Sequence, residues 1–272
     1  MEARIALAQD KSNGKTRLLR MTLDRIPAPA LSALGLLLFL LIWEAAPALG
    51  LVPASVLPPP SALPRAFIRE LQSGIWFSSL VTSLRHYLAG LAIGCTLGVG
   101  LGVATGMFRP LEAFLGWVVR VLRPIPGLAW VPFAILWFGI EPSAAIFIIA
   151  VGVFWISYFA ALSAVRAVDR DLIEVADAFD FRRPDQKLLK VILPAAAPGI
   201  LAGLRTALGQ AWMAVVAAEI FGVPGLGQRM TQAANLLASD VVVIYMATMA
   251  ALYGIIDLLF VAAQNRALRW KR

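Results

Sequence analysis

The chain has 272 residues, of which 60% are hydrophobic and 15% are charged, and its mean hydropathy is +0.79. A soluble domain carries about 25% charged residues, and so apolar a chain could not cover its own surface with polar side chains. Composition therefore excludes an ordinary soluble domain and favours an integral membrane protein. The net charge of +8 lies in blocks that flank apolar runs, whereas a nucleic-acid binder would carry a continuous basic stripe on a polar domain.

The N-terminal segment is polar. Residues 1–26 carry six Lys and Arg residues and no short apolar run, so they are unlike a signal peptide. We expect residues 1–28 to form a cytoplasmic N-terminal arm and residues 29–272 to form a transmembrane domain.

Six apolar segments have the length of about 20 residues that a helix needs to cross the hydrocarbon core. They lie at 29–49, 80–106, 113–138, 143–165, 197–220 and 241–264. The predicted fold class is all-α, a polytopic membrane protein with about six transmembrane helices. The third segment is interrupted by two basic residues and three prolines, namely Arg120, Arg123, Pro124, Pro126 and Pro132.

Basic residues are concentrated on one side of these segments. Six lie in the N-terminal arm, six in the 166–190 loop and four in the C-terminal tail. Only Arg65, Arg69 and Arg229 fall on the other side. Because Lys and Arg are enriched in cytoplasmic flanks, we expect both termini and the 166–190 loop to be cytoplasmic.

The first connection outside the membrane begins with an extended proline-rich stretch. Residues 61–73 then predict a short amphipathic helix that lies on the membrane surface. Its apolar face is formed by Leu63, Ala66, Phe67 and Leu71. The single histidine, His86, follows near the expected start of the second span and is predicted to be an interfacial residue.

The second span carries glycine at every fourth position, at Gly90, Gly94, Gly98, Gly102 and Gly106. This spacing keeps the glycines on one helical face, where they allow another helix to approach closely. Tight static packing is the favoured interpretation, and a sliding surface in a moving protein is the alternative.

Charged residues inside the spans are candidates for a solute pathway, because such residues face a cavity or pair with each other. Arg120 and Arg123 lie on one helical face. They form either a positive wall for an anion or a pair that snorkels to a helix end. The remaining candidates are Trp137, Arg205, Trp212 and Glu219, and the tryptophans could equally be interfacial anchors.

An enzyme would need a catalytic set that this sequence lacks. One histidine cannot supply a zinc HExxH motif, and nothing pairs Glu219 with Asp257. The sequence predicts a transport protein with no catalytic residue, no metal site and no cofactor of its own.

The 166–190 loop predicts two short amphipathic helices, which suit a docking element better than a plain connector. Leu172, Ile173, Ala176 and Phe179 share one face of the first. At these residues the chain resembles the permease subunits of bacterial ABC importers, whose cytoplasmic loop carries an EAA-xxx-G-x9-I-x-LP pattern. Glu174-Val175-Ala176 matches its start and Val191-Ile192-Leu193-Pro194 its end, but Asp180 or Phe181 replaces the glycine and the stretch is one residue longer.

Residues from about 40 to 272 resemble the sulfonate/taurine/nitrate branch of that family. The fragments that carry the resemblance, in chain order, are Leu57-Pro-Pro-Pro60, Leu122-Arg-Pro-Ile-Pro126, Ile135-Leu-Trp-Phe-Gly139, Ala217-Ala-Glu-Ile-Phe-Gly222 and Gly225-Leu-Gly227.

The resemblance implies the type I importer permease fold and a pore formed by two permease copies in the bacterial inner membrane. Two cytoplasmic ATPase subunits, which bind ATP and Mg, would dock on a coupling loop over about 166–196. An extracytoplasmic solute-binding protein would deliver a small anionic solute. The loop residues implied in coupling are Glu174, Ala176, Phe179, Asp180, Phe181, Arg182, Leu193 and Pro194. A stand-alone secondary transporter or channel is the alternative, although no inverted repeat is evident.

Overall fold

The computed structural model describes residues 27–179, 181 and 183–271, and this part of the chain is helical without a strand. The chain divides into two units, Met1–Pro64 and Arg65–Arg272, which we describe separately. Most of the predicted N-terminal arm lies outside the described residues.

The first unit contains α2 (Ala28–Ala48), an extended segment and the 3-10 turn η1 (Pro60–Ala62). The Trp43 indole N–H donates to the Pro58 carbonyl at 3.0 Å. The backbone N–H and hydroxyl of Ser61 donate to the Glu44 carboxylate at 3.0 and 2.7 Å. These bonds hold the proline-rich segment against the end of α2.

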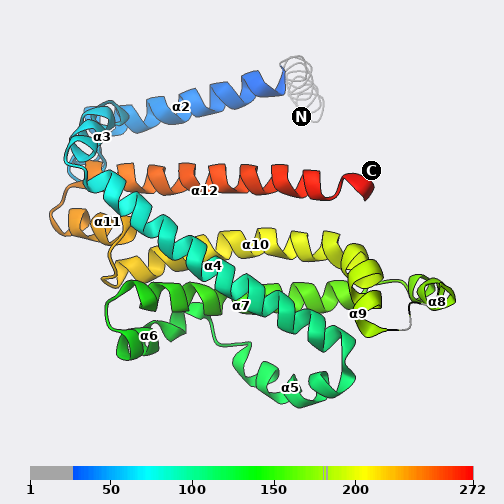
Figure 1. Cartoon of the computed structure of the whole chain (residues 1–272). Helices are drawn as coiled ribbons and strands as arrows, with labels where there is room; N and C mark the ends of the chain where they lie inside the picture. The colour runs from blue at the N-terminus through cyan, green and yellow to red at the C-terminus, as the bar shows by residue number, and fades with distance from the viewer. Residues whose placement is uncertain (1–26, 180, 182, 272) are drawn as a thin grey trace, which may run out of the picture. The chain divides into compact units, whose positions relative to one another are not determined.

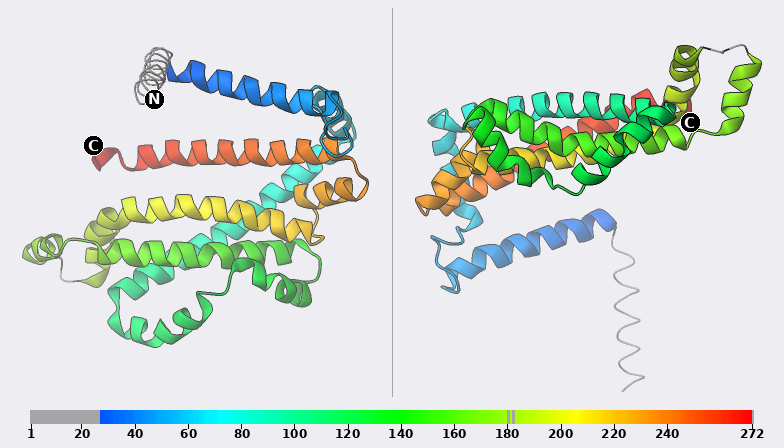
Figure 2. Two further views of the ribbon diagram at one scale, coloured as in Figure 1. Left: turned by 180° about the vertical axis from the view of Figure 1, so that it is seen from behind. Right: turned by 90° about the horizontal axis from the view of Figure 1, so that it is seen from below.

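The second unit is built on four long helices, α4 (Ile75–Met107), α7 (Pro142–Arg166), α10 (Leu193–Ile220) and α12 (Ser239–Ala267). In Figures 1 and 2, α7, α10 and α12 run side by side and α4 crosses them obliquely. By length and composition, α2, α4, α7, α12 and the run Asp185–Ile220 that contains α10 are the five candidate spans.

The third predicted span is a bent pair of helices. The α5 helix (Arg109–Leu122) and the run formed by η2 (Gly127–Trp130) and α6 (Val131–Phe138) meet at 85°. Pro124 and Pro126 lie in the break, where they have no N–H to continue a helix. Counting this pair as one span confirms the prediction of about six.

Shorter helices complete the second unit. They are α3 (Leu63–Gln72), α8 (Arg170–Ala178), α9 (Pro184–Lys187), the π-helical turn η3 (Leu188–Ile192), α11 (Leu226–Asn235) and η4 (Arg269–Lys271). The α9, η3 and α10 elements follow one another without a break, so the loop after α7 is joined directly to a spanning helix.

The glycine stripe of α4 is its contact face with α7. A Cβ atom built on Gly94 would lie 2.6 Å from the Ala150 carbonyl oxygen, and one on Gly98 would lie 2.6 Å from that of Phe154. The same holds along the stripe, where Gly90, Gly102 and Gly106 meet Ile149, Tyr158 and Val165. The two backbones are therefore closer than any residue with a side chain would allow.

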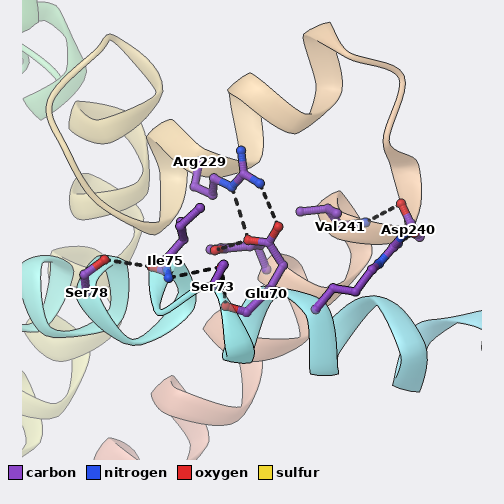
Figure 3. Close-up of polar contacts among 9 residues, drawn as sticks. Glu70, Ser73, Ile75, Ser78, Arg229, Asp240 and Val241 are labelled. Atoms are coloured by element: carbon purple, nitrogen blue, oxygen red, sulfur yellow. Dashed lines mark hydrogen bonds and ion pairs between the residues drawn. The ribbon is translucent and has the colours of Figure 1, made fainter.

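The α3 helix has a buried polar contact in addition to its predicted apolar face. Ala66 and Glu70 are its buried residues, whereas Leu71 is 47% exposed. Glu70 faces protein because its carboxylate accepts hydrogen bonds from the Arg229 guanidinium at 2.6 and 3.2 Å (Figure 3). It also accepts a hydrogen bond from the Tyr245 hydroxyl at 2.8 Å. The helix is thus held by a polar contact with α11 and α12 that an apolar-face prediction does not include.

This contact shifts the ionisation of both partners. The hydrogen-bonded Arg229 guanidinium holds the pKa of Glu70 below its ordinary range, and Glu70 in turn raises the pKa of Arg229. Arg69 and Asp240 form a second ion pair between α3 and α12 at 2.7 Å. At the turn into α4, the Ser73 hydroxyl donates to the Glu70 carbonyl and accepts from the Ile75 N–H.

Gly98→Ala should lower the Tm of the detergent-purified protein, because overpacking a close contact costs about 1–3 kcal/mol. Size-exclusion chromatography after heating measures the remaining folded fraction. Gly100→Ala on the same helix is the matched control, since a Cβ there meets nothing within 4 Å. Equal Tm values for the two variants would contradict a packed stripe.

Acid should weaken the contact of α3 with α11. A carboxyl whose pKa is lowered on folding contributes stability that is complete above its unfolded pKa, about 4.3, and is lost as the pH falls through the folded value. Between about pH 6 and pH 3, wild type should therefore lose more Tm than Glu70→Gln, which cannot titrate at this position. Parallel Tm profiles would show that the pair contributes no pH-dependent stability.

Candidate functional site

A buried polar cluster joins α4, α10 and the start of α11. Ser83, His86 and Glu219 are each at most 2% exposed. One Glu219 carboxylate oxygen accepts from the Ser83 hydroxyl at 2.8 Å and from the Gly227 N–H at 2.9 Å. The other lies 3.2 Å from His86 Nδ1. The Ser83 oxygen in turn accepts from the Leu226 N–H at 2.9 Å.

Side chains of this cluster, which come from other helices, cap the N-terminus of α11. The first N–H groups of a helix have no partner within it and carry partial positive charge, so a carboxylate there is favourable. Glu219 and Ser83 supply acceptors for Gly227 and Leu226, the first two residues of α11. A Cβ atom at Gly225 would overlap the Glu219 carboxylate, so glycine allows the chain to pass. The irregular segment between α10 and α11 is thereby anchored to α4.

Sequence patterns missed two members of this cluster. His86 was expected at the interface, but α4 begins at Ile75 instead of residue 80, which carries His86 deep into the helix. Ser83 and His86 are three residues apart and share a helical face. This spacing of two polar residues is the sequence feature that could have identified them. Glu219, a pathway candidate, is wholly buried with both oxygens engaged.

Arg205 is placed beside a carboxylate. Its Nε and Nη2 atoms donate to the two oxygens of Asp257 on α12, each at 2.8 Å. Such a bidentate pair neutralises the charge locally.

The two candidate tryptophans pack against other aromatic rings. Trp212 is buried edge-on against Tyr87, with ring centroids 5.4 Å apart. Trp137 is 57% exposed and packs with Phe147 in an aromatic cluster at α6.

Arg120 and Arg123 lie together near the end of α5. The Arg120 guanidinium carbon is 4.8 Å from the centre of the Trp117 ring, and that of Arg123 is 4.4 Å from the Phe159 ring on α7. Both arginines line a hollow of about 500 Å³ together with Gly116, Val119, Pro124 and Phe159. These two residues are brought to one surface, whereas Arg205 and Glu219 are held by other partners.

The loop after α7 folds as a helix, a turn and a second helical run. Asp177 on α8 pairs with Lys187 on α9 at 2.5 Å, and Phe181 donates its N–H to the Ala176 carbonyl at 3.0 Å. The Lys190 amine lies 4.7 Å from the centre of the Phe181 ring. Asp180 and Arg182 lie outside the described residues.

The predicted apolar face of α8 is divided between two directions. Ala176 is 3% exposed and Ile173 is half-buried, so this side faces inward. Leu172, Val175 and Phe179 are 46%, 52% and 73% exposed and stand outward, and Glu174 is also exposed. Leu193 and Pro194 begin α10, beyond the π-helical turn. The exposed side of α8 thus combines apolar and acidic groups.

Removing the Glu219 carboxylate should destabilise the fold. Glu219→Ala leaves the Gly227 N–H and the Ser83 hydroxyl without their acceptor, and each buried unsatisfied group costs about 1–3 kcal/mol. We expect a clear fall in Tm in detergent. Glu112→Ala is the control, since its half-exposed pair with Arg166 should contribute about 0–1 kcal/mol. A Tm loss no larger than that of the control would mean that the cluster is not an anchor.

This chain is similar to known proteins in both sequence and fold. A family model described as a binding-protein-dependent transport system inner membrane component matches residues 94–271. The chain is 39% identical over 191 residues to the putative aliphatic sulfonates transport permease protein SsuC of Bacillus subtilis (strain 168), covering 69% of each chain. It is 30% identical over 274 residues to the taurine transport system permease protein TauC of Escherichia coli (strain K12), covering 97% of each.

The fold is similar to that of a chain in an inward-facing structure of the MetNI methionine ABC transporter. The TM-score is 0.60 at 24% identity, over 74% of this chain and 97% of that one. The predicted type I permease fold is confirmed, as are the resemblance to the sulfonate/taurine/nitrate branch and a multi-pass location in the inner membrane. The chain belongs to the family of binding-protein-dependent inner membrane components, as a permease subunit of an ABC importer.

Proposed function

We propose that this permease moves a small anionic solute, of the sulfonate, taurine or nitrate kind, across the inner membrane by alternating access. The observation that carries the proposal is the similarity to TauC over nearly the whole chain, together with that to SsuC. These two relatives are named for the transport of taurine and of aliphatic sulfonates, and both kinds of solute carry a sulfonate group. The arginine-lined hollow beside α5 is consistent with such a solute.

We further propose that two cytoplasmic ATPase subunits, which bind ATP and Mg, drive this change by pushing on the 166–196 loop. Support comes from the exposed Leu172, Val175 and Phe179 on α8, since apolar groups in a loop indicate a docking surface. The Asp177–Lys187 pair ties α8 to the helical run that continues into α10. A displacement of α8 would thereby reach a spanning helix. The partner must bind the two pore states with different affinity for ATP to drive the switch.

The proposed assembly contains a second copy of this chain and an extracytoplasmic solute-binding protein. Both termini face the cytoplasm, which the bias of Lys and Arg in the flanking segments supports. In this assembly, ATP is hydrolysed by the separate ATPase subunit that contacts the 166–196 loop.

Glu174→Lys should uncouple ATP hydrolysis from transport, because it reverses the charge on the exposed side of α8 without touching a buried contact. The measurement is ATP-driven uptake of taurine and ethanesulfonate into proteoliposomes that hold the assembled transporter, with phosphate release followed in parallel. Glu174→Gln, which keeps the shape, should retain more transport. Unchanged coupled uptake in Glu174→Lys would refute this role. Solute movement by the purified permease alone would instead identify a channel or secondary carrier.

A further inference from the structure

Several arginines of the second unit have a carboxylate partner among the described residues. The five pairs are Arg69–Asp240, Arg166–Glu112, Arg183–Asp185, Arg205–Asp257 and Arg229–Glu70. For Arg120 and Arg123, by contrast, no described carboxylate lies within 4 Å. Two adjacent positive charges without a counter-charge are a costly arrangement in a span, so their presence calls for an explanation.

The position of the pair makes simple snorkelling insufficient. Arg123 rests on Phe159, which lies seven residues before the last residue of α7, or about 10 Å along the helix axis. Contact with Phe159 holds the Arg123 guanidinium at this position along α7, and Arg120 lines the same hollow. A guanidinium over a ring face still has N–H groups that can donate hydrogen bonds, and no described carboxylate accepts from Arg120 or Arg123.

The α5 helix presents two different faces. Gly116, Arg120 and Arg123 follow one another at spacings of four and three, so they share a face with the hollow. The opposite side carries exposed apolar groups, with Phe114, Val118 and Val121 between 48% and 78% exposed. An apolar side suits lipid, whereas the arginine side requires water or an anion.

We propose that Arg120 and Arg123 form an anion-binding station at membrane depth, in the hollow that they share with Phe159. Its ligand is the oxyanion head of a small solute, such as a sulfonate, because the planar guanidinium fork donates paired hydrogen bonds to two oxygens of one group. The role of a station during transport rests on the proposed function. The binding site itself does not, and it can be tested on the permease alone.

A cysteine at Gly116 provides a local probe of charge. A Cβ atom there meets nothing within 4 Å, so Gly116→Cys introduces a thiol on the arginine face without a clash. The background carries Cys95→Ala, which removes the one native cysteine. Two methanethiosulfonate reagents of similar size are compared on the full chain in an uncharged detergent, one ending in a sulfonate and one in a trimethylammonium group. Val119→Cys is a second reporter from the same hollow.

The sulfonate reagent should react faster than the cationic one, and Arg120→Gln with Arg123→Gln should lower this rate ratio by about tenfold or more. Arg205→Gln removes an arginine that Asp257 already neutralises, and Arg85→Gln removes one that does not line the hollow. Neither control should change the ratio. A ratio insensitive to Arg120 and Arg123 would overturn the proposal.

Compounds that protect the introduced cysteine from labelling identify the ligand of the hollow. Ethanesulfonate should slow labelling by the sulfonate reagent, and choline should not. If ethanesulfonate has no effect while added phosphatidylglycerol protects, the arginines bind a lipid phosphate and the proposal is wrong. The labelling test is independent of the test of the proposed function. If the assembled wild-type transporter showed no ATP-driven uptake, the proposed function would be refuted, but the ratio of labelling rates would be unchanged.

Discussion

The contact between α4 and α7 is the constraint on which the second unit depends. Lipid supplies no hydrophobic drive to bring apolar helices together, so van der Waals contact between closely spaced backbones must do so. Glycine at every fourth position of α4 brings Gly94 and Gly98 against backbone carbonyls of α7. The other face of α7 packs on α10, and Gly199 and Gly203 of α10 meet Ala164 and Ala160 in the same way. Small residues thus bring three helices into one closely packed block.

Charge compensation is the second organising rule. The wholly buried Glu219 is satisfied by α4 and by the start of α11, and Glu70 is satisfied by Arg229 and Tyr245. Each bond joins elements that apolar packing alone would leave free to slide, so the irregular segment around Gly225 is held in one place. Arg120 and Arg123, for which no described carboxylate lies within 4 Å, are the residues for which we propose an anion as the partner.

The loop after α7 shows how a weakly packed element is attached to a strongly packed one. The α8 helix buries little beyond Ala176, but an ion pair and a continuous helical run connect it to α10. A small helix with exposed Leu172, Val175 and Phe179 can accept a partner on one side. Because α10 also packs on α7, a force applied at the loop would act on both helices and not on α10 alone.

Sequence alone was enough for the membrane location, the number of spans, the broken third span and the family, because each depends on composition or on short patterns within one segment. Pairing of charges could not be predicted in this way. Arg205 meets Asp257 at a separation of 52 residues, and Ser83 meets Glu219 at 136. Such partners share no local pattern, and helix crossing angles and the start of α4 decide which side chains meet. Only the tertiary structure could therefore show that Glu219 and Arg205 are already paired, while Arg120 and Arg123 remain free of any described carboxylate.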